Sequence, residues 1–234
     1  RTLIRAQRRR GAAESSISKF IPATSSKHVG PMFDVTWMPF LTALSGEAQN
    51  THNLEIIRLC MEGQKLAIRI ACLFDLENPR QAFVASLARF TNLYNLSEMK
   101  AKNVEALKVL LEIAQNEGNL LRESWRDILT CISQLDRFQL ISTGVDQAAV
   151  PDVLRTHVQP QASQVRRSLN VPSRQRPRAP SSNLSFQSDI AEESRSTDMI
   201  RAVDRIFTNT ANLSGEAIVY FVKALTQVSW QEIQ

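Results

Sequence analysis

Apolar residues recur along most of the chain at steps of three and four residues, the spacing of one face of an α-helix. The clearest example is the stripe formed by Leu121, Trp125, Ile128, Ile132 and Leu135. No segment shows the alternating pattern of a half-buried strand bounded by turns, so the pattern predicts an all-α fold. We expect helices near residues 33–49, 53–74, 79–94, 97–117, 120–142, 197–209 and 215–230.

Local signals predict where several of these helices begin and end. Asn78 followed by Pro79 is typical of an N-cap and a first helical position, and Ser97 is a candidate cap for the next helix. Gly118 suits a left-handed helix stop. Pro39 is expected to kink the first helix or to start it anew.

Short helices joined by tight connections indicate an antiparallel helical repeat of the armadillo or HEAT type, that is, a segment of an α-solenoid. The helix at 53–74 is apolar on most of its sides, and we expect it to be buried on most sides. The expected core contains Trp37, Ile57, Ile68, Phe83, Leu87, Phe90, Leu107, Leu111, Trp125, Ile128 and Ile132.

Residues 145–196 break the helical pattern. They contain five of the nine prolines and many Ser, Gln and Arg residues, with few apolar ones. This composition predicts a flexible insertion. The expected organisation is a basic flank at 1–30 and one helical domain formed by 31–144 and 197–234, with the insertion between its two parts.

The composition agrees with a folded protein, since 43% of the 234 residues are hydrophobic. No apolar run approaches the roughly 20 residues that span a bilayer. The cysteines Cys60, Cys72 and Cys131 lie within apolar helical patterns, which is typical of buried thiols in a reducing cytosol. The chain begins with Arg1 and shows no signal peptide, so we expect a piece of a larger protein.

The sequence predicts no catalytic residue, metal site or cofactor. His28, His52 and His157 are far apart, and Cys60 and Cys72 would lie about 18 Å from each other along one helix. A phosphate-binding glycine loop and a nucleophile elbow are both absent, and the chain contains only 7 glycines.

Positive charge is concentrated outside the predicted helices. Residues 1–30 contain seven basic and one acidic side chain, whereas the helical regions carry more acidic than basic residues, which argues against nucleic-acid binding. Arg5, Arg8, Arg9 and Arg10 are candidates for contact with an anionic membrane surface. The alternative is a solvated linker. Apolar residues on both sides of this run could enter a lipid surface: Leu3, Ile4, Ile17, Phe20 and Ile21.

Two long segments carry a resemblance to a known family. The first is residues 32–144, including the ungapped stretch GNLLRESWRDILTCISQLDR at 118–137. The second is VDRIFTNTANLSGEAIVYFVKAL at 203–225. Both closely resemble the large Golgi Arf guanine-nucleotide exchange factors of the Sec-seven and BIG type. In that family the matching region is the first homology-downstream domain, which follows the catalytic domain.

The resemblance implies a regulatory rather than a catalytic role. It suggests a module that autoinhibits the exchange enzyme in the cytosol and recruits it to trans-Golgi membranes by binding GTP-loaded Arf, a positive feedback in vesicular transport. The implied partners are Arf-GTP, the anionic Golgi membrane and the catalytic domain of the same chain, with a homodimer as a further possibility. The same resemblance implies a location in the cytosol and peripherally on trans-Golgi membranes.

One segment is similar to the glutamate finger of the family's catalytic domain. The sequence around that finger is roughly Leu-Pro-Gly-Glu-Ala-Gln-Lys-Ile. Here Glu47 follows Ser45 and Gly46, so that Ser45 replaces the proline, and the flanking residues belong to the downstream pattern. A second Ser-Gly-Glu-Ala at Ser214–Ala217 suggests a recurrent loop or capping sequence. We therefore do not assign Glu47 a role in exchange.

Two alternatives to the regulatory module remain. The chain could be a structural spacer that mediates dimerisation within the same protein, or it could itself catalyse exchange through the Glu47 segment.

Overall fold

A computed structural model describes residues 25–95, 98–145, 150, 152 and 196–233. All regular elements in these residues are helices, which confirms the predicted all-α fold. The α-helices are α2 (Val29–Asn50), α3 (Leu54–Leu73), α4 (Glu77–Phe90), α5 (Ala101–Glu117), α6 (Trp125–Ser142), α8 (Thr197–Asn209) and α9 (Gly215–Ile233). Short 3-10 turns at Ser26–His28, Gly118–Leu120, Arg122–Ser124 and Thr210–Asn212 lie between them or at their ends.

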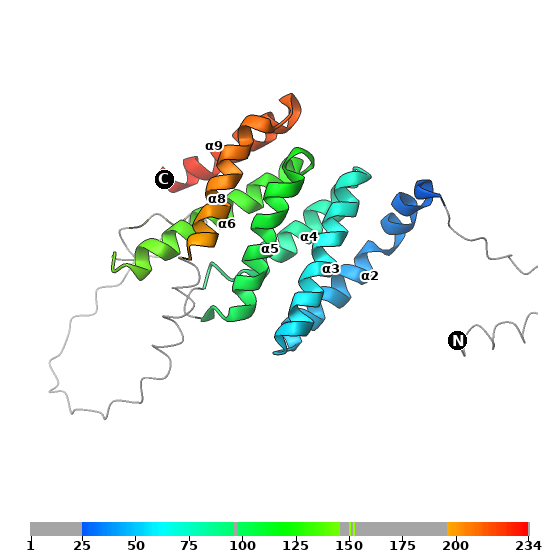
Figure 1. The fold of residues 1–234 in the computed structure, drawn as a ribbon, viewed down its shortest axis with the longest axis horizontal. Coiled ribbons are helices and arrows are strands. Elements are labelled where there is room, and N and C mark those ends of the chain that lie inside the picture. Colours follow the sequence, from blue (N-terminus) through cyan, green and yellow to red (C-terminus); the bar gives the residue numbers. More distant parts are fainter. Residues whose placement is uncertain (1–24, 96–97, 146–149, 151, 153–195, 234) are drawn as a thin grey trace, which may run out of the picture.

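The helices form two layers, and the chain passes from one layer to the other at each connection (Figure 1). In the first layer α2 packs against α4, α4 against α6, and α6 against α9. In the second layer α3 packs against α5, and α5 packs against α8. This is the expected α-solenoid of armadillo or HEAT type. The last two helices complete both layers, although the long segment 146–195 separates them from α6 in the sequence.

Most of the expected core is buried between the two layers. Nine of the eleven predicted core residues are buried, and the exceptions, Trp37 and Phe90, are half-buried. Trp37 lies on α2, the first helix of its layer, which packs against α3 and α4 but has no neighbour before it among the described helices. Phe90 ends α4, and the ammonium group of Lys102 lies 5.5 Å from its ring centroid.

Two predicted helix starts are wrong. Helix α4 begins at Glu77 with Leu76 as its N-cap, so Asn78 lies inside the helix. Pro79 is buried in the first turn, where no intrahelical partner exists for a backbone N–H. Helix α5 begins at Ala101 rather than near Ser97, which lies outside the described residues.

The side chain of Asn103 defines the start of α5. Its Oδ1 accepts a hydrogen bond from the backbone N–H of Lys100 at 2.7 Å, and its Nδ2 donates to the carbonyl oxygen of Phe90 at 2.6 Å. One buried amide therefore satisfies the first turn of α5 and the last turn of α4 together.

The predicted restart of the first helix at Pro39 is also wrong, because α2 continues through it from Val29 to Asn50. The left-handed stop expected at Gly118 is absent, since this residue has a right-handed φ of −48°. Its glycine is required by close packing instead. A Cβ at this position would lie 3.2 Å from the Trp125 ring and 3.3 Å from Leu213. By contrast, Gly144 is left-handed after α6, with φ of 97°.

The ring of Trp125 joins the middle of the chain to its last helix. The side chain is 1% exposed, and its Nε1 donates to the carbonyl oxygen of Gly118 at 3.0 Å. The edge of the ring meets Phe221 of α9 in a T-shaped contact, with centroids 4.9 Å apart. Beside it, Asn119 Oδ1 accepts from the backbone N–H of Ser214 at 2.7 Å. Ser214 in turn caps α9 as expected, accepting from the N–H of Ala217 at 3.4 Å.

None of the described helices is long and apolar enough to cross a bilayer.

Ile128→Asp should unfold the protein. Ile128 is fully buried in α6, and an unpaired carboxylate at this position would cost more than about 3 kcal/mol. Circular dichroism during heating should show loss of the cooperative transition. Val219→Asp on the exposed side of α9 is the matched control and should melt like the wild type. If Ile128→Asp melts cooperatively at the wild-type temperature, Ile128 does not lie on the buried face of α6.

Candidate binding surfaces

The most regular uncovered surface is an apolar stripe on α3. We define the α3 stripe by six residues at alternating steps of three and four: Ile56, Leu59, Gly63, Leu66, Ile70 and Leu73. Its uncovered part is formed by Ile56, Leu59, Leu66 and Leu73, whereas Ile70 is half-buried against the core and a Cβ on Gly63 would lie 3.0 Å from Leu44 of α2. Leu59 and Leu73 are 72% and 64% exposed, and Ile56 and Leu66 are also exposed. This spacing is the one with which a helix packs against another helix.

The position of α3 in the fold explains why the stripe is uncovered. Helix α3 packs against α2, α4 and α5, and it is the first helix of its layer among the described residues. Residues such as Ile57, Cys60 and Ile68 meet those neighbours and are buried. The expectation that this helix is buried on most sides is therefore wrong, because only its inward faces have neighbours.

A row of ion pairs connects α3 to α5 at the edge of their packed faces. Three basic side chains of α3 each meet one acidic side chain of α5. The pairs are Arg58 with Glu105 at 3.1 Å, Lys65 with Glu112 at 3.1 Å, and Arg69 with Glu117 at 3.5 Å. Basic residues on one helix and acidic residues on the other favour a single register between the two helices.

Two of these groups have shifted pKa values. Partial burial alone would raise the pKa of Glu105, but the hydrogen bond from Arg58 and the charge of Lys108 outweigh it and lower that pKa. The pKa of Lys65 is raised, first by its hydrogen bond with Glu62 and then by Glu112, against the effect of burial. Both shifts favour the charged forms and so favour the ion pairs.

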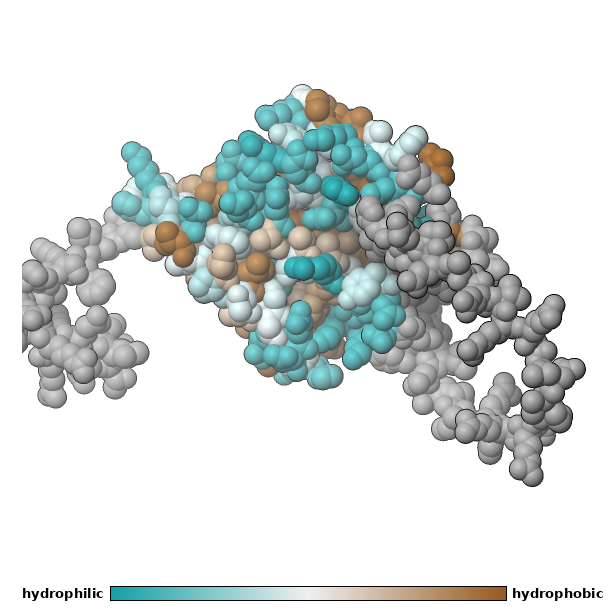
Figure 2. All heavy atoms as spheres, turned by 180° about the vertical axis from the view of Figure 1, so that it is seen from behind, coloured by the Kyte–Doolittle hydropathy of each residue, from teal (hydrophilic) through white to brown (hydrophobic). Residues whose placement is uncertain are grey.

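A second apolar surface lies at the end of the molecule where the described chain begins. It is a groove of about 430 Å³ along the N-terminal half of α2, and we call it the α2 groove. In Figure 2, hydrophobic side chains gather beside the point where the N-terminal segment joins. The residues lining the α2 groove are Ser25, His28, Val29, Met32, Phe33, Val35, Thr36, Phe40 and Ile70.

A third surface is a polar cavity of about 570 Å³ between α2 and α4, bordered by Arg89, Tyr94 and Lys102. The Lys102 ammonium donates to the carbonyl oxygens of Ala48 at 3.2 Å and Gln49 at 2.8 Å, so it binds the C-terminal end of α2. Burial, and secondarily the charge of Lys100, lowers the pKa of Lys102. Its contacts assign Lys102 to helix capping.

The candidate membrane-contact residues predicted from the sequence, Arg5, Arg8, Arg9 and Arg10, lie outside the described residues. Glu47 is an exposed residue in the last turn of α2, where its backbone carbonyl accepts the N–H of Thr51 at 3.0 Å.

The two Ser-Gly-Glu-Ala segments are different elements. The first is part of α2, and the second begins α9 with Ser214 as its cap. The expectation of one recurrent loop or capping sequence is therefore wrong for the first segment.

Within the described residues, no three His, Cys, Asp or Glu side chains lie close enough to bind a metal ion. His28 and His52 are exposed on separate connections, and His157 lies outside the described part of the chain. The three cysteines are buried free thiols, as expected. Burial raises the pKa of Cys72 and of Cys131 to about 12, so both thiols are protonated at neutral pH.

Sequence reasoning missed two charged contacts that tie connections to helices. Asp75 pairs with Arg80, which is 1% exposed, at 3.3 Å, and with Arg122 at 3.0 Å. Asp152, within the predicted insertion, approaches buried Arg137 of α6 at 3.5 Å and accepts from Gln134 at 3.2 Å. No local sequence pattern predicts either contact, because the paired residues belong to different elements.

The Glu105 ion pair should make stability depend on pH. Because the folded-state pKa of Glu105 lies below its ordinary value of 4.5, its contribution is present above about pH 4.5 and is lost as the pH falls through the folded-state pKa. Glu105→Gln should reduce the free energy of unfolding at pH 7 by about 1 kcal/mol or less and flatten the acid side of the stability curve. Urea unfolding between pH 3 and pH 7 measures both effects. An equally steep acid side in Glu105→Gln would show that other carboxylates carry the dependence.

The comparisons relate nearly the whole chain to a short part of much longer proteins. No protein-family model matches. Over 97% of its length the chain is 43% identical to the ADP-ribosylation factor guanine nucleotide-exchange factor sec72 of Schizosaccharomyces pombe. It is 38% identical over 92% of its length to the exchange factor SEC7 of Saccharomyces cerevisiae. It is 41% identical, also over 92%, to the human Brefeldin A-inhibited guanine nucleotide-exchange protein 1.

The chain spans only 11–13% of the length of these curated relatives. At these identities the match indicates common descent over the helical repeat as a whole and not a shared short motif. The chain is therefore homologous to one segment of the Arf guanine-nucleotide exchange factors of the Sec7 and BIG type.

Proposed function

We propose that the chain is a regulatory, non-catalytic module of an Arf guanine-nucleotide exchange factor and that it binds Arf in its GTP-bound state. The relatives are named for exchange on ADP-ribosylation factor, which makes this GTPase the first candidate partner. The observation that carries a binding role is the α3 stripe, because a soluble protein rarely leaves a regular apolar helix face uncovered without a partner.

The described residues support binding better than catalysis. Glu47 is an exposed residue within α2, which continues for three more residues. The resemblance to the region after the catalytic domain favours autoinhibition of the exchange enzyme and its recruitment by its own product, Arf-GTP. Catalysis through Glu47 is thus the weaker alternative.

We further propose that recruitment takes place on trans-Golgi membranes with help from the basic flank. Each Lys or Arg near an anionic leaflet contributes about 1 kcal/mol, so Arg5, Arg8, Arg9 and Arg10 together give a weak, salt-sensitive contact. Two weak contacts on one surface strengthen each other through effective concentration. Membrane-anchored Arf-GTP and the flank should therefore retain the protein together better than either does alone.

A structural spacer remains the second candidate function. The same α3 stripe could pack against the stripe of a second copy, as a two-helix contact with this spacing would allow. This alternative predicts a dimer and no dependence on the nucleotide that Arf carries.

Pull-down with immobilised Arf tests the proposed contact. Wild-type protein should bind Arf loaded with a non-hydrolysable GTP analogue and should bind Arf-GDP much more weakly. Leu59→Ser combined with Leu66→Ser should weaken binding about tenfold or more, because both side chains are exposed and central in the α3 stripe. Val219→Ser with Val222→Ser on α9 removes similar exposed apolar surface and should leave binding unchanged.

Equal binding of the two nucleotide forms would contradict the proposal. Equal loss of binding in the α9 control would show that the α3 stripe is not the contact. Sedimentation of the wild type as a dimer, converted to a monomer by the α3 substitutions, would favour the spacer.

Liposome flotation tests the flank. Changing Arg5, Arg8, Arg9 and Arg10 to Glu should abolish binding to anionic vesicles without Arf and reduce it several-fold with anchored Arf-GTP. Raising the salt concentration should mimic the substitution for wild-type protein. If the four substitutions leave flotation unchanged, the flank is a solvated linker.

A further inference from the structure

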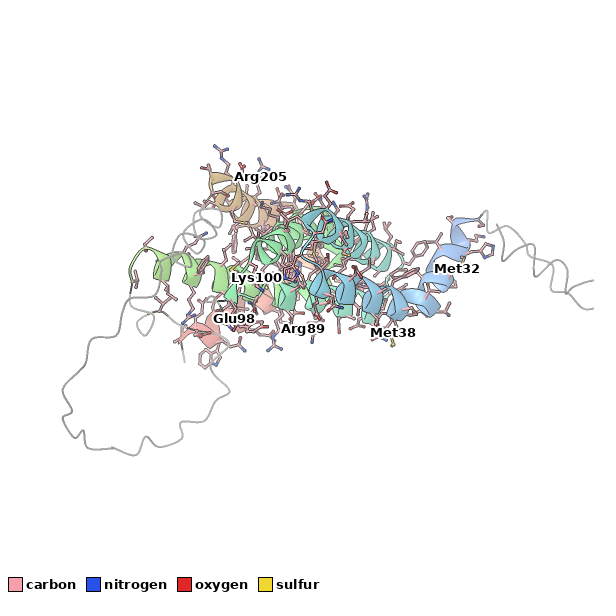
Figure 3. All side chains as sticks on the ribbon, turned by 90° about the horizontal axis from the view of Figure 1, so that it is seen from below. Met32, Met38, Arg89, Glu98, Lys100 and Arg205 are labelled. Carbon is pink, nitrogen blue, oxygen red and sulfur yellow. The ribbon has the colours of Figure 1, made fainter. Side chains whose placement is uncertain are left out.

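The α2 groove is apolar, uncovered and open at the end of the molecule. Val35 is 78% exposed, and Met32 and Phe40 are also exposed, while Phe33 and Ile70 form the floor toward the core. Figures 1 and 3 show the N-terminal half of α2, which includes Met32, extending beyond the other helices. This half of α2 therefore lacks the neighbours that cover its C-terminal half.

We propose that the chain's own segment around Ile17, Phe20 and Ile21 occupies the α2 groove. Ile17 and Phe20 are three residues apart, so in a helical turn they share one face, and Ile21 follows directly. Their apolar side chains match the apolar lining of the groove. The proposal does not depend on the proposed Arf contact, whose exposed residues on α3 do not line the groove; only the half-buried Ile70 belongs to both surfaces.

The connection between segment and groove is short and of suitable length. Ser25, the first described residue, itself lines the groove, so the preceding segment enters at its rim. Four residues separate Phe20 from Ser25, and the five steps from one Cα to the next allow a reach of up to about 17 Å. The groove follows α2 from Val29 to Phe40, a length of about 17 Å at the helical rise.

The sequence between the segment and α2 also favours a reversal of the chain direction. Pro22 has no backbone N–H and disfavours helical geometry at Ile21, so a helical turn containing Phe20 must end before α2 begins. The cap of the following 3-10 turn is Ser25, which is extended and accepts from the N–H of Lys27 at 3.3 Å. The segment can thus fold back along α2 without disturbing the first helical turn.

Tethering favours this occupant over a second copy of the chain. A segment joined through four residues has an effective concentration in the millimolar range, whereas a second molecule must pay the cost of association. The charges of the segment and the groove are also complementary. Lys19 of the segment is basic, and Asp34 is an exposed acidic residue on α2 between the groove residues Phe33 and Val35.

Hydrogen exchange of the intact chain tests the docking. Ile17→Ser, Phe20→Ser and Ile21→Ser together should make the amides of residues 29–40 exchange at least about tenfold faster than in wild type. Val35→Asp, at an exposed position in the groove wall, should have the same effect from the other side of the contact. Leu3→Ser with Ile4→Ser alters the same flank outside the docking segment and should change nothing.

A peptide of residues 15–24 added in trans to the triple-serine variant should restore slow exchange at residues 29–40. Wild-type exchange rates in the triple-serine variant would overturn the proposal. Slow exchange that is lost on dilution, together with a dimer in sedimentation, would also overturn it and assign the groove to a second copy. Thermal melting of each variant shows whether the remaining helices are intact.

Discussion

In a stack of two helical layers, a helix buries only the sides that face its neighbours, and this constraint accounts for the surfaces of the molecule. Helix α5 has α3 on one side and α8 on the other, so its apolar residues are almost all buried. Helix α3 has a neighbour in its layer on one side only, and its opposite face is the α3 stripe. The same constraint leaves the N-terminal half of α2 uncovered. The uncovered surfaces thus belong to the architecture and are not defects in packing.

Three kinds of contact keep these surfaces in position. Burial of residues such as Ile57, Met61 and Ile68 sets the rotation of α3, and the ion pairs between α3 and α5 agree with it. Trp125, packed edge-on against Phe221, joins the middle of the chain to α9. Asp75 holds buried Arg80 and the connection at Arg122 together, although both Asp75 and Arg122 have left-handed φ angles near 50°. The stack presents its apolar stripe on a rigid support, which reduces the entropy that binding must overcome.

The helical period predicted all seven α-helices of the described residues and most of the core, because long amphipathic segments carry a strong signal. The predictions from local sequence rules were wrong where packing between helices decides the conformation. At Gly118 the rule predicts a left-handed stop, but the space beside Trp125 and Leu213 requires the glycine. The exposed face of α3 could not be predicted, because apolar residues on all sides of a helix do not reveal which sides have neighbours. Contacts such as Arg58 with Glu105 join residues 47 positions apart and leave no local pattern.

The proposed binding of Arf-GTP to the α3 stripe can be measured by hydrogen exchange of the chain with and without saturating Arf. We expect slower exchange at residues 56–73 with Arf-GTP, little change with Arf-GDP, and no change in α9. Protection confined to α8 and α9, or equal protection by the two nucleotide forms, would show that Arf-GTP does not bind the α3 stripe.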